Sequence, residues 1–243
     1  MIMKTTIPFI VTLLISMSLI AQEKTSFPSL DKLEITADVY DIGDDKPVII
    51  LCHQAGYSRG EYREIAPKLN KLGFNCIAID QRSGNSVNGV NNETAERAKA
   101  KMLPTKYINA EQDIKAAINF ARTKFNSKVI LWGSSYSASL VLKLANEEEH
   151  VLAVLSFSPG EYYGNNLNIK ESAAGMSKPV FVTSSKSEAS KAAGVMEKIP
   201  DSENKVHFIP QGEGIHGSRT LWESKPDHKE YWAAVTAFLE KLK

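Results

Sequence analysis

The sequence predicts an α/β fold in which helices cover both faces of a mostly parallel sheet. Two observations support this prediction: short apolar runs without alternation recur along the chain, and segments with helical periodicity separate them. Uninterrupted apolar runs are typical of strands buried on both faces. Strands that take turns with helices favour parallel pairing through helical crossovers. The 243 residues, 43% hydrophobic and 23% charged, are enough for one well-buried core.

The N-terminal residues have the pattern of a secretory signal peptide. A positive charge at Lys4 precedes the mostly apolar stretch 7–20, and polar residues begin at Gln22. The apolar stretch is short for a spanning helix, which needs roughly twenty apolar residues. We therefore expect residues 1–21 to be removed, and 22–243 to form one secreted or periplasmic domain with no stable membrane insertion. A leader retained as a membrane anchor is the alternative.

The elements of this domain follow in order. Residues 33–40 alternate apolar and polar side chains, which predicts a half-buried strand. Uninterrupted apolar runs predict six further strands, at 48–52, 76–79, 129–132, 152–157, 180–183 and 206–209. Apolar residues at helical spacing predict five helices, over 62–69, 114–125, 138–145, 192–199 and 232–242. Two stretches, 81–105 and 160–178, fit neither pattern, and we expect them to be loops beyond strand ends.

The charge balance and the two cysteines exclude several classes of protein. The 29 basic and 28 acidic residues form no basic run, so we expect no nucleic-acid partner. Cys52 and Cys76 are too few for an all-thiolate zinc site. Both lie in apolar strands that we expect to run side by side, where parallel strands rarely offer the geometry of a disulfide. We therefore expect two buried free thiols.

A candidate nucleophile lies where the predicted strand 129–132 turns into a helix. The segment 133–137 reads Gly-Ser-Ser-Tyr-Ser, a Gly-x-Ser-x-Gly motif whose final glycine is Ser137 and whose central residue is Ser135. A sharp turn between strand and helix exposes such a serine hydroxyl, as a nucleophile elbow requires. Helix capping by Ser134 or Ser135 is the alternative. Here the sequence resembles the α/β-hydrolase family, which implies a three-layer sandwich of helices, sheet and helices.

The resemblance implies an oxyanion hole. The segment 52–57 contains His-Gln-Ala-Gly and is similar to the family's His-Gly-x-Gly turn, with Gln54 in place of the first glycine. In the family, this turn and the residue after the nucleophile each donate a backbone N–H to the oxyanion. The donors implied here are Ala55, with Gln54 as the alternative, and Tyr136. His53 is expected to be structural.

A serine nucleophile needs a general base at neutral pH, and the base needs an acid to orient it. The glycine-rich loop 211–217 presents His216 and looks like the family's catalytic histidine turn. The chain order serine, acid, histidine places the acid after the next-to-last predicted strand. There Glu188 takes the place of the family's aspartate. Glu213 and Asp201 are rivals for this role.

The resemblance spans nearly the whole domain and is closest to dienelactone-hydrolase-type carboxylesterases. Larger relatives insert a cap where this chain has only 158–179, which implies a minimal cap and an open cleft walled by Tyr162, Tyr163 and Trp222. The implied activity is hydrolysis of a small-molecule ester through an acyl-enzyme on Ser135, without a metal or organic cofactor. A peptidase or amidase of the same fold and a non-catalytic binding protein are the alternatives. Acyl specificity and oligomeric state stay open.

Overall fold

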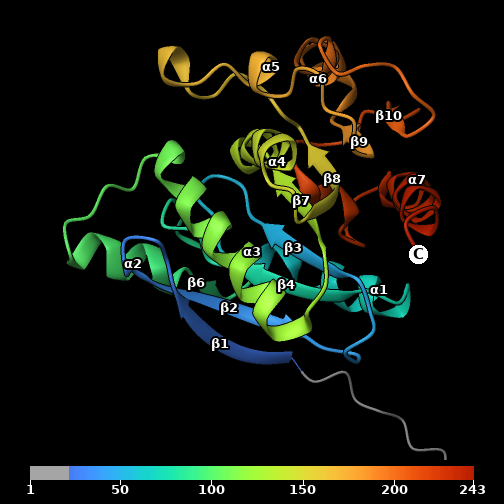
Figure 1. The fold of residues 1–243 in the computed structure, drawn as a ribbon. Helices are drawn as coiled ribbons and strands as arrows, with labels where there is room; N and C mark the ends of the chain where they lie inside the picture. Colours follow the sequence, from blue (N-terminus) through green and yellow to red (C-terminus); the bar gives the residue numbers. More distant parts are fainter. Residues whose placement is uncertain (1–21) are drawn as a thin grey trace, which may run out of the picture.

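A computed structural model describes residues 22–243 and shows an eight-stranded sheet (Figure 1). The predicted leader, 1–21, lies outside the described residues. In sheet order the strands are β1 (Gln22–Pro28), β2 (Glu34–Tyr40), β4 (Asn75–Ile79), β3 (Val48–Cys52), β7 (Val129–Ser134), β8 (Val151–Phe157), β9 (Val180–Thr183) and β10 (Lys205–Phe208). In this order, all neighbouring strands from β4 to β10 pair in parallel. The pairs β1–β2 and β2–β4 are antiparallel. The prediction of a mostly parallel sheet is confirmed.

Helices cover both faces of the sheet, which completes the expected three layers (Figure 1). One face packs against α1 (Ile65–Lys71) and α7 (His228–Glu240); the other packs against α2 (Glu93–Ala100), α3 (Glu111–Phe125), α4 (Tyr136–Glu147), α5 (Ile169–Ser172) and α6 (Ala189–Met196). Successive residues of a strand point to opposite faces. In β3, Ile50 and Ile49 therefore enter different apolar clusters, which explains the uninterrupted apolar run. Among residues 22–243, no helix is both long and apolar enough to span a bilayer.

The strand β2 is buried on both faces, not half-buried as its alternating pattern predicts. The polar residue Asp38 faces Arg59, whose Nε lies 3.1 Å from the carboxylate. The backbone N–H of Thr36 donates to the hydroxyl of Thr94, on α2. Polar alternation in this strand therefore marks a buried ion pair and the underside of a helix, not a face in contact with water.

The two cysteines are free and buried, as expected. They lie on neighbouring strands, where Cys52 pairs in register with Ile79 and Cys76 with Ile49. Cys52 belongs to the apolar cluster on one face of the sheet, and Cys76 to the cluster on the other. Side chains on opposite faces do not supply the facing Cβ atoms that a disulfide needs.

Candidate active site

The turn between β7 and α4 forces Ser135 into a strained conformation. The strand ends at Ser134 and the helix begins at Tyr136, so Ser135 alone makes the turn, with φ 58° and ψ −121°. Its N–H donates to the carbonyl of Phe157, 2.8 Å away, which holds the turn against β8. A Cβ at Gly133 would lie 2.5 Å from the carbonyl oxygen of residue 137 in α4. Close packing of strand and helix therefore requires glycine there, and strain of this kind is typical of functional sites.

The structure brings Ser135, His216 and Glu188 into one hydrogen-bonded row. Nε2 of His216 lies 2.7 Å from Oγ of Ser135, and Nδ1 lies 2.6 Å from Oε1 of Glu188. Glu188 ends the short helix η4 (Lys186–Glu188) after β9, and His216 lies in the loop after β10. All three therefore come from the carboxyl ends of parallel strands, where open α/β sheets bind ligands.

The rival acids lie elsewhere. Asp201 forms a surface ion pair with Lys205, with 2.9 Å between Nζ and Oδ1. Glu213 meets η4 only through its backbone carbonyl, which accepts from the N–H of Lys186. Among the described residues, Glu188 is the carboxylate that hydrogen bonds to the ring of His216.

A serine that the sequence did not single out positions Glu188. Oγ of Ser158 donates to Oε2 of Glu188 at 2.9 Å and accepts from the N–H of Gly217 at 3.0 Å. Although burial opposes ionisation, the hydrogen bond and charge of His216 and the Ser158 hydroxyl lower the pKa of Glu188 to about 2. The ionised carboxylate favours a proton on Nδ1 of His216, which leaves Nε2 to accept from Ser135. The sequence signal that could have indicated Ser158 is its position directly after β8, at the edge of the sheet where the site lies.

The backbone of the turn 52–57, the oxyanion turn, distinguishes between the two donors that the sequence left open. The N–H of Gln54 donates to Oε2 of Glu61 at 2.8 Å, so Gln54 is not the free donor. The N–H of Ala55 has no acceptor among residues 22–243. Nδ1 of His53 lies 2.8 Å from the carbonyl oxygen of Gln54. Because the C=O and N–H of a trans peptide point in opposite directions, the N–H of Ala55 points away from the ring of His53. At the start of α4, the N–H of Tyr136 likewise has no intrahelical acceptor.

Ser137, which replaces the motif's final glycine, ties α4 to the oxyanion turn. Its hydroxyl donates to the carbonyl oxygen of His53 at 2.6 Å and accepts from Nε2 of Gln81 at 2.7 Å. The ring of His53 accepts from the N–H of Gln81 at 3.0 Å, and burial lowers the pKa of His53 to about 4. His53 is therefore a neutral, structural histidine, as expected, and the departure from the motif adds a hydrogen bond.

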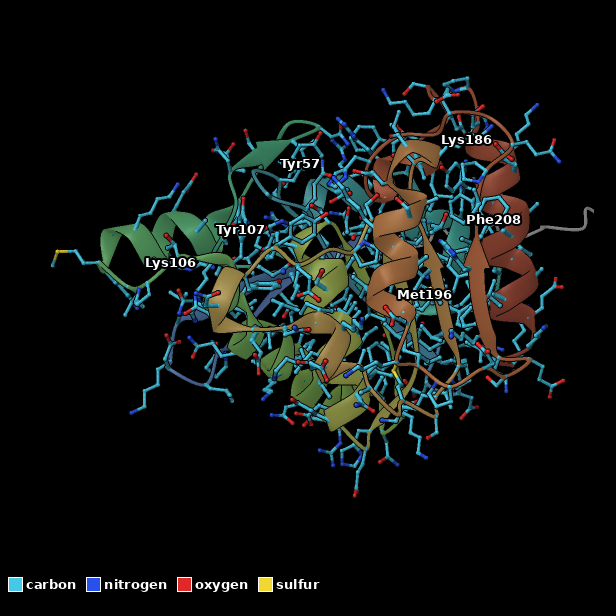
Figure 2. All side chains as sticks on the ribbon, turned by 90° about the horizontal axis from the view of Figure 1, so that it is seen from above. Tyr57, Lys106, Tyr107, Lys186, Met196 and Phe208 are labelled. Carbon is cyan, nitrogen blue, oxygen red and sulfur yellow. The ribbon has the colours of Figure 1, made fainter. Side chains whose placement is uncertain are left out.

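A cavity of about 600 Å³ opens beside the imidazole, lined by Pro159, Tyr162, Lys170, Glu188, Lys191 and His216 among others. It lies between the loop after β8 and the helices α5 and α6. Figure 2 looks onto α6, whose Met196 is labelled, with Phe208 of β10 on one side of it and Tyr107 on the other. The segment 158–179 thus forms only a small cap, as the sequence predicts.

Of the three aromatic residues expected to wall the cleft, only Tyr162 lines this cavity. Tyr163 is buried, and its hydroxyl donates to the carbonyl of Tyr136 at 2.6 Å. Trp222 is buried as well, and its Nε1 donates to the carbonyl of Glu61 at 2.9 Å. The prediction for Tyr163 and Trp222 is wrong because each ring packs in the core while its polar atom finds a backbone acceptor.

A hydroxyl, an imidazole and a carboxylate in a row, with free amides close by in the fold, suit transfer of an acyl group. Within residues 22–243, no group of three or more His, Cys, Asp or Glu side chains could hold a metal ion. A sheet of this order, with a serine in a strained turn at the end of its central strand β7, places the protein among the α/β-hydrolases.

The sequence profile of the dienelactone hydrolase family matches residues 37–208, and the chain belongs to this family. Family membership confirms the resemblance and identifies the protein as a hydrolase. No curated protein sequence matches the chain.

Solved structures share the fold. An esterase from Pyrococcus furiosus has a TM-score of 0.68 at 17% identity, over 91% of this chain and 93% of that one. A dienelactone hydrolase from Anabaena variabilis has a TM-score of 0.69 at 15% identity, over 91% and 97% of the two chains. The α/β hydrolase GrgF from a Penicillium species has a TM-score of 0.70 at 12% identity, over 91% and 98%.

Proposed function

We propose that the protein is a serine hydrolase that cleaves small-molecule esters through an acyl-enzyme on Ser135. The observation that carries the proposal is the row of hydrogen bonds from Ser135 through His216 to Glu188. Family membership and the esterases among the structural neighbours support an ester as the substrate. The cavity beside His216 has the size of a small-molecule site.

In the first half of the reaction, Oγ of Ser135 attacks the ester carbonyl while Nε2 of His216 takes its proton. Glu188 stabilises the imidazolium that forms. The N–H groups of Ala55 and Tyr136 stabilise the negative charge that develops on the carbonyl oxygen. The tetrahedral intermediate then expels the alcohol, which receives the proton from His216, and an acyl-enzyme is left.

In the second half, water attacks the acyl group and His216 takes a proton from that water. The same amides stabilise the second oxyanion. The bond to Ser135 breaks, His216 returns the proton to the serine, and a carboxylic acid leaves. Nucleophile, base and oxyanion donors all come from the chain itself.

A fluorophosphonate probe and a single variant test this mechanism. The probe should modify Ser135, and Ser135→Ala should lower turnover of short acyl esters by at least about 10³-fold. Ser202→Ala, at an exposed loop position, is the matched control and should keep the native rate. Labelling of another serine, or full activity in Ser135→Ala, would refute the mechanism. Faster cleavage of aminoacyl amides than of activated esters would identify a peptidase or amidase, and a folded protein that is never labelled would be a binding protein.

The leader supports a further proposal, that the protein is exported and its leader removed. Mass spectrometry of the exported protein should find a chain that begins near Gln22. Membrane-bound material that still begins at Met1 would show that the leader is an anchor.

A further inference from the structure

Glu61 is a fully buried acid to which the proposed reaction assigns no role. It lies in the helix η1 (Arg59–Tyr62), directly after the oxyanion turn, and its exposed fraction is 0%. Its two carboxylate oxygens accept from two different segments. Oε2 accepts from the N–H of Gln54 at 2.8 Å, and Oε1 accepts from the hydroxyl of Ser134 at 2.7 Å.

Through Ser134 the same carboxylate reaches a third segment. Oγ of Ser134 donates its proton to Glu61 and accepts from the N–H of Ser218 at 2.9 Å. Ser218 begins η5 (Ser218–Leu221) and directly follows the loop that presents His216. Gln54 precedes the proposed oxyanion donor, and Ser134 precedes the nucleophile. The partners of the Glu61 carboxylate, direct or through Ser134, therefore lie one or two residues from a reacting group.

The helix that carries Glu61 is itself firmly anchored. The guanidinium of Arg59 lies 2.6 Å from the carboxylate of Asp80 and 3.1 Å from that of Asp38. The carbonyl of Glu61 accepts from Nε1 of Trp222 at 2.9 Å. Because the helix is anchored, the Glu61 carboxylate cannot move with the segments that contact it, and it can therefore hold them in place.

We propose that Glu61 is a positioning residue that holds the oxyanion turn, the nucleophile elbow and the histidine loop in their reactive arrangement. The proposal rests on the serine mechanism above. Glutamine at this position would keep the shape of the side chain but would have only one acceptor oxygen. It could accept from only one of Gln54 and Ser134, and its NH2 group would face the other, so the negative charge and one of the two present donor–acceptor pairings would be lost.

Opposing effects set the ionisation of Glu61. Burial raises the pKa of Glu61 to about 7, although the N–H of Gln54, the hydroxyl of Ser134 and the charges of Arg219 and His216 oppose the rise. The titratable groups that face it are Arg219 and His216, from the segment after β10, and Tyr62 on its own helix. An ionised Glu61 also favours the imidazolium that His216 becomes during the reaction.

Steady-state kinetics on a short acyl ester test the proposal. Glu61→Gln should lower kcat by about 10- to 100-fold, as small misplacements of reacting groups do, while KM changes by less than about threefold. Labelling by the fluorophosphonate should slow by a similar factor. Ser134→Ala should act in the same direction but less strongly, because it cuts the link to Ser218 and leaves the contact to Gln54. If Glu61→Gln does not fold, Ser134→Ala carries the test with the same readouts.

Asn70→Ala is the matched control. Asn70 is also buried, and its Nδ2 donates to the carbonyls of Tyr40 and Phe74, far from the site in the fold. The control should lower the melting temperature but keep the native kcat, which separates positioning from stability. A folded Glu61→Gln with native kcat would overturn the proposal.

Hydrogen exchange distinguishes failure of the proposed function from failure of this inference. If the native protein hydrolyses no ester, the proposed function fails, and the amides of Gln54 and Ser218 then decide whether Glu61 holds these segments. Faster exchange of either amide in folded Glu61→Gln supports the positioning role. Exchange of both amides at the native rate would overturn it.

Discussion

The two sides of the nucleophile elbow differ in how their polar groups are held. On the side of β3 and β7, the polar side chains are buried and hydrogen bond between elements, as those of Glu61, Ser134 and Ser137 do. On the side of α5 and α6, charged side chains line the cavity and reach solvent, and in the Lys170–Glu197 ion pair Glu197 is 65% exposed. Loss of the partner of a buried polar group costs far more free energy of folding than loss of an exposed ion pair. The reacting groups are therefore placed rigidly, while the walls that would contact substrate tolerate substitution.

The largest effect should follow from a change in the hydrogen-bonded row of Ser135, His216 and Glu188, which lies between the two sides. Glu188→Gln removes the carboxylate that orients His216, and we expect kcat to fall by about 10³- to 10⁴-fold with the fold intact. Glu213→Gln is the matched control and should leave kcat unchanged, because the Glu213 side chain does not hydrogen bond to the imidazole. Steady-state kinetics and circular dichroism measure both. Loss of activity in Glu213→Gln instead would reverse the assignment of the acid.

Two glycines differ in the space around them in the same way. A Cβ at Gly133 would lie 2.5 Å from a backbone oxygen of α4, whereas one at Gly194 in α6 would meet nothing within 4 Å. We expect Gly133→Ala to lower the free energy of unfolding by about 3 kcal/mol and to remove activity. Gly194→Ala should raise it by about 0.5–1 kcal/mol, because alanine favours the helix. Urea denaturation measures both changes, and equal effects at the two sites would contradict the comparison.

The pH dependence of stability should reveal the buried acid on the rigid side. Burial raises the pKa of Glu61 from 4.5 to about 7, so the native state binds more protons than the unfolded state between these values. The native protein should therefore lose about 3 kcal/mol of stability relative to Glu61→Gln as pH rises from 4.5 through 7. Urea denaturation of both proteins at pH 5 and pH 8 measures the difference. A difference that does not change with pH would show that Glu61 titrates normally.

The smallest effect on stability should come from the cavity side. Lys170→Ala breaks the exposed ion pair with Glu197, and we expect an unchanged melting temperature because water screens such pairs. The variant should alter KM for esters whose acyl groups fill the cavity more than it alters kcat. Thermal unfolding and kinetics on a series of acyl chain lengths check this. A large fall in kcat with constant KM would show that this wall also positions the reacting groups.

The buried strands and the main helices could be predicted because local apolar periodicity reports burial directly. Several shorter elements could not, among them a strand and a helix at one edge of the sheet. The strand β1 is a polar edge strand with little apolar surface. The helix α2 buries Thr94, Ala95 and Ala98, too small an apolar face to give a helical signal. Both cover the antiparallel edge of the sheet, which explains why β2 looked half-exposed.

Within the candidate site, residues in a local motif were easier to find than residues that act across elements. Ser135 stands in a Gly-x-Ser turn and His216 in a glycine-rich loop, each after a strand, and each pattern is visible in one short segment. Ser158 and Glu61 show no such pattern, because their partners lie on other elements. The same limit explains the error over Trp222, since no local pattern tells a buried aromatic ring from one that lines a cleft.

The amino-acid sequence alone predicted the order of the buried strands and main helices and the side chains at the strand ends, because both depend on neighbouring residues in the chain. It took the folded arrangement of residues 22–243 to show that, within them, the amide of Ala55 and not that of Gln54 is free, and that Glu188 and not its rivals meets the imidazole. The first choice depends on the hydrogen bond between Gln54 and Glu61, and the second on the one between His216 and Glu188. Neither joins neighbouring residues, so its geometry exists only once the chain has folded.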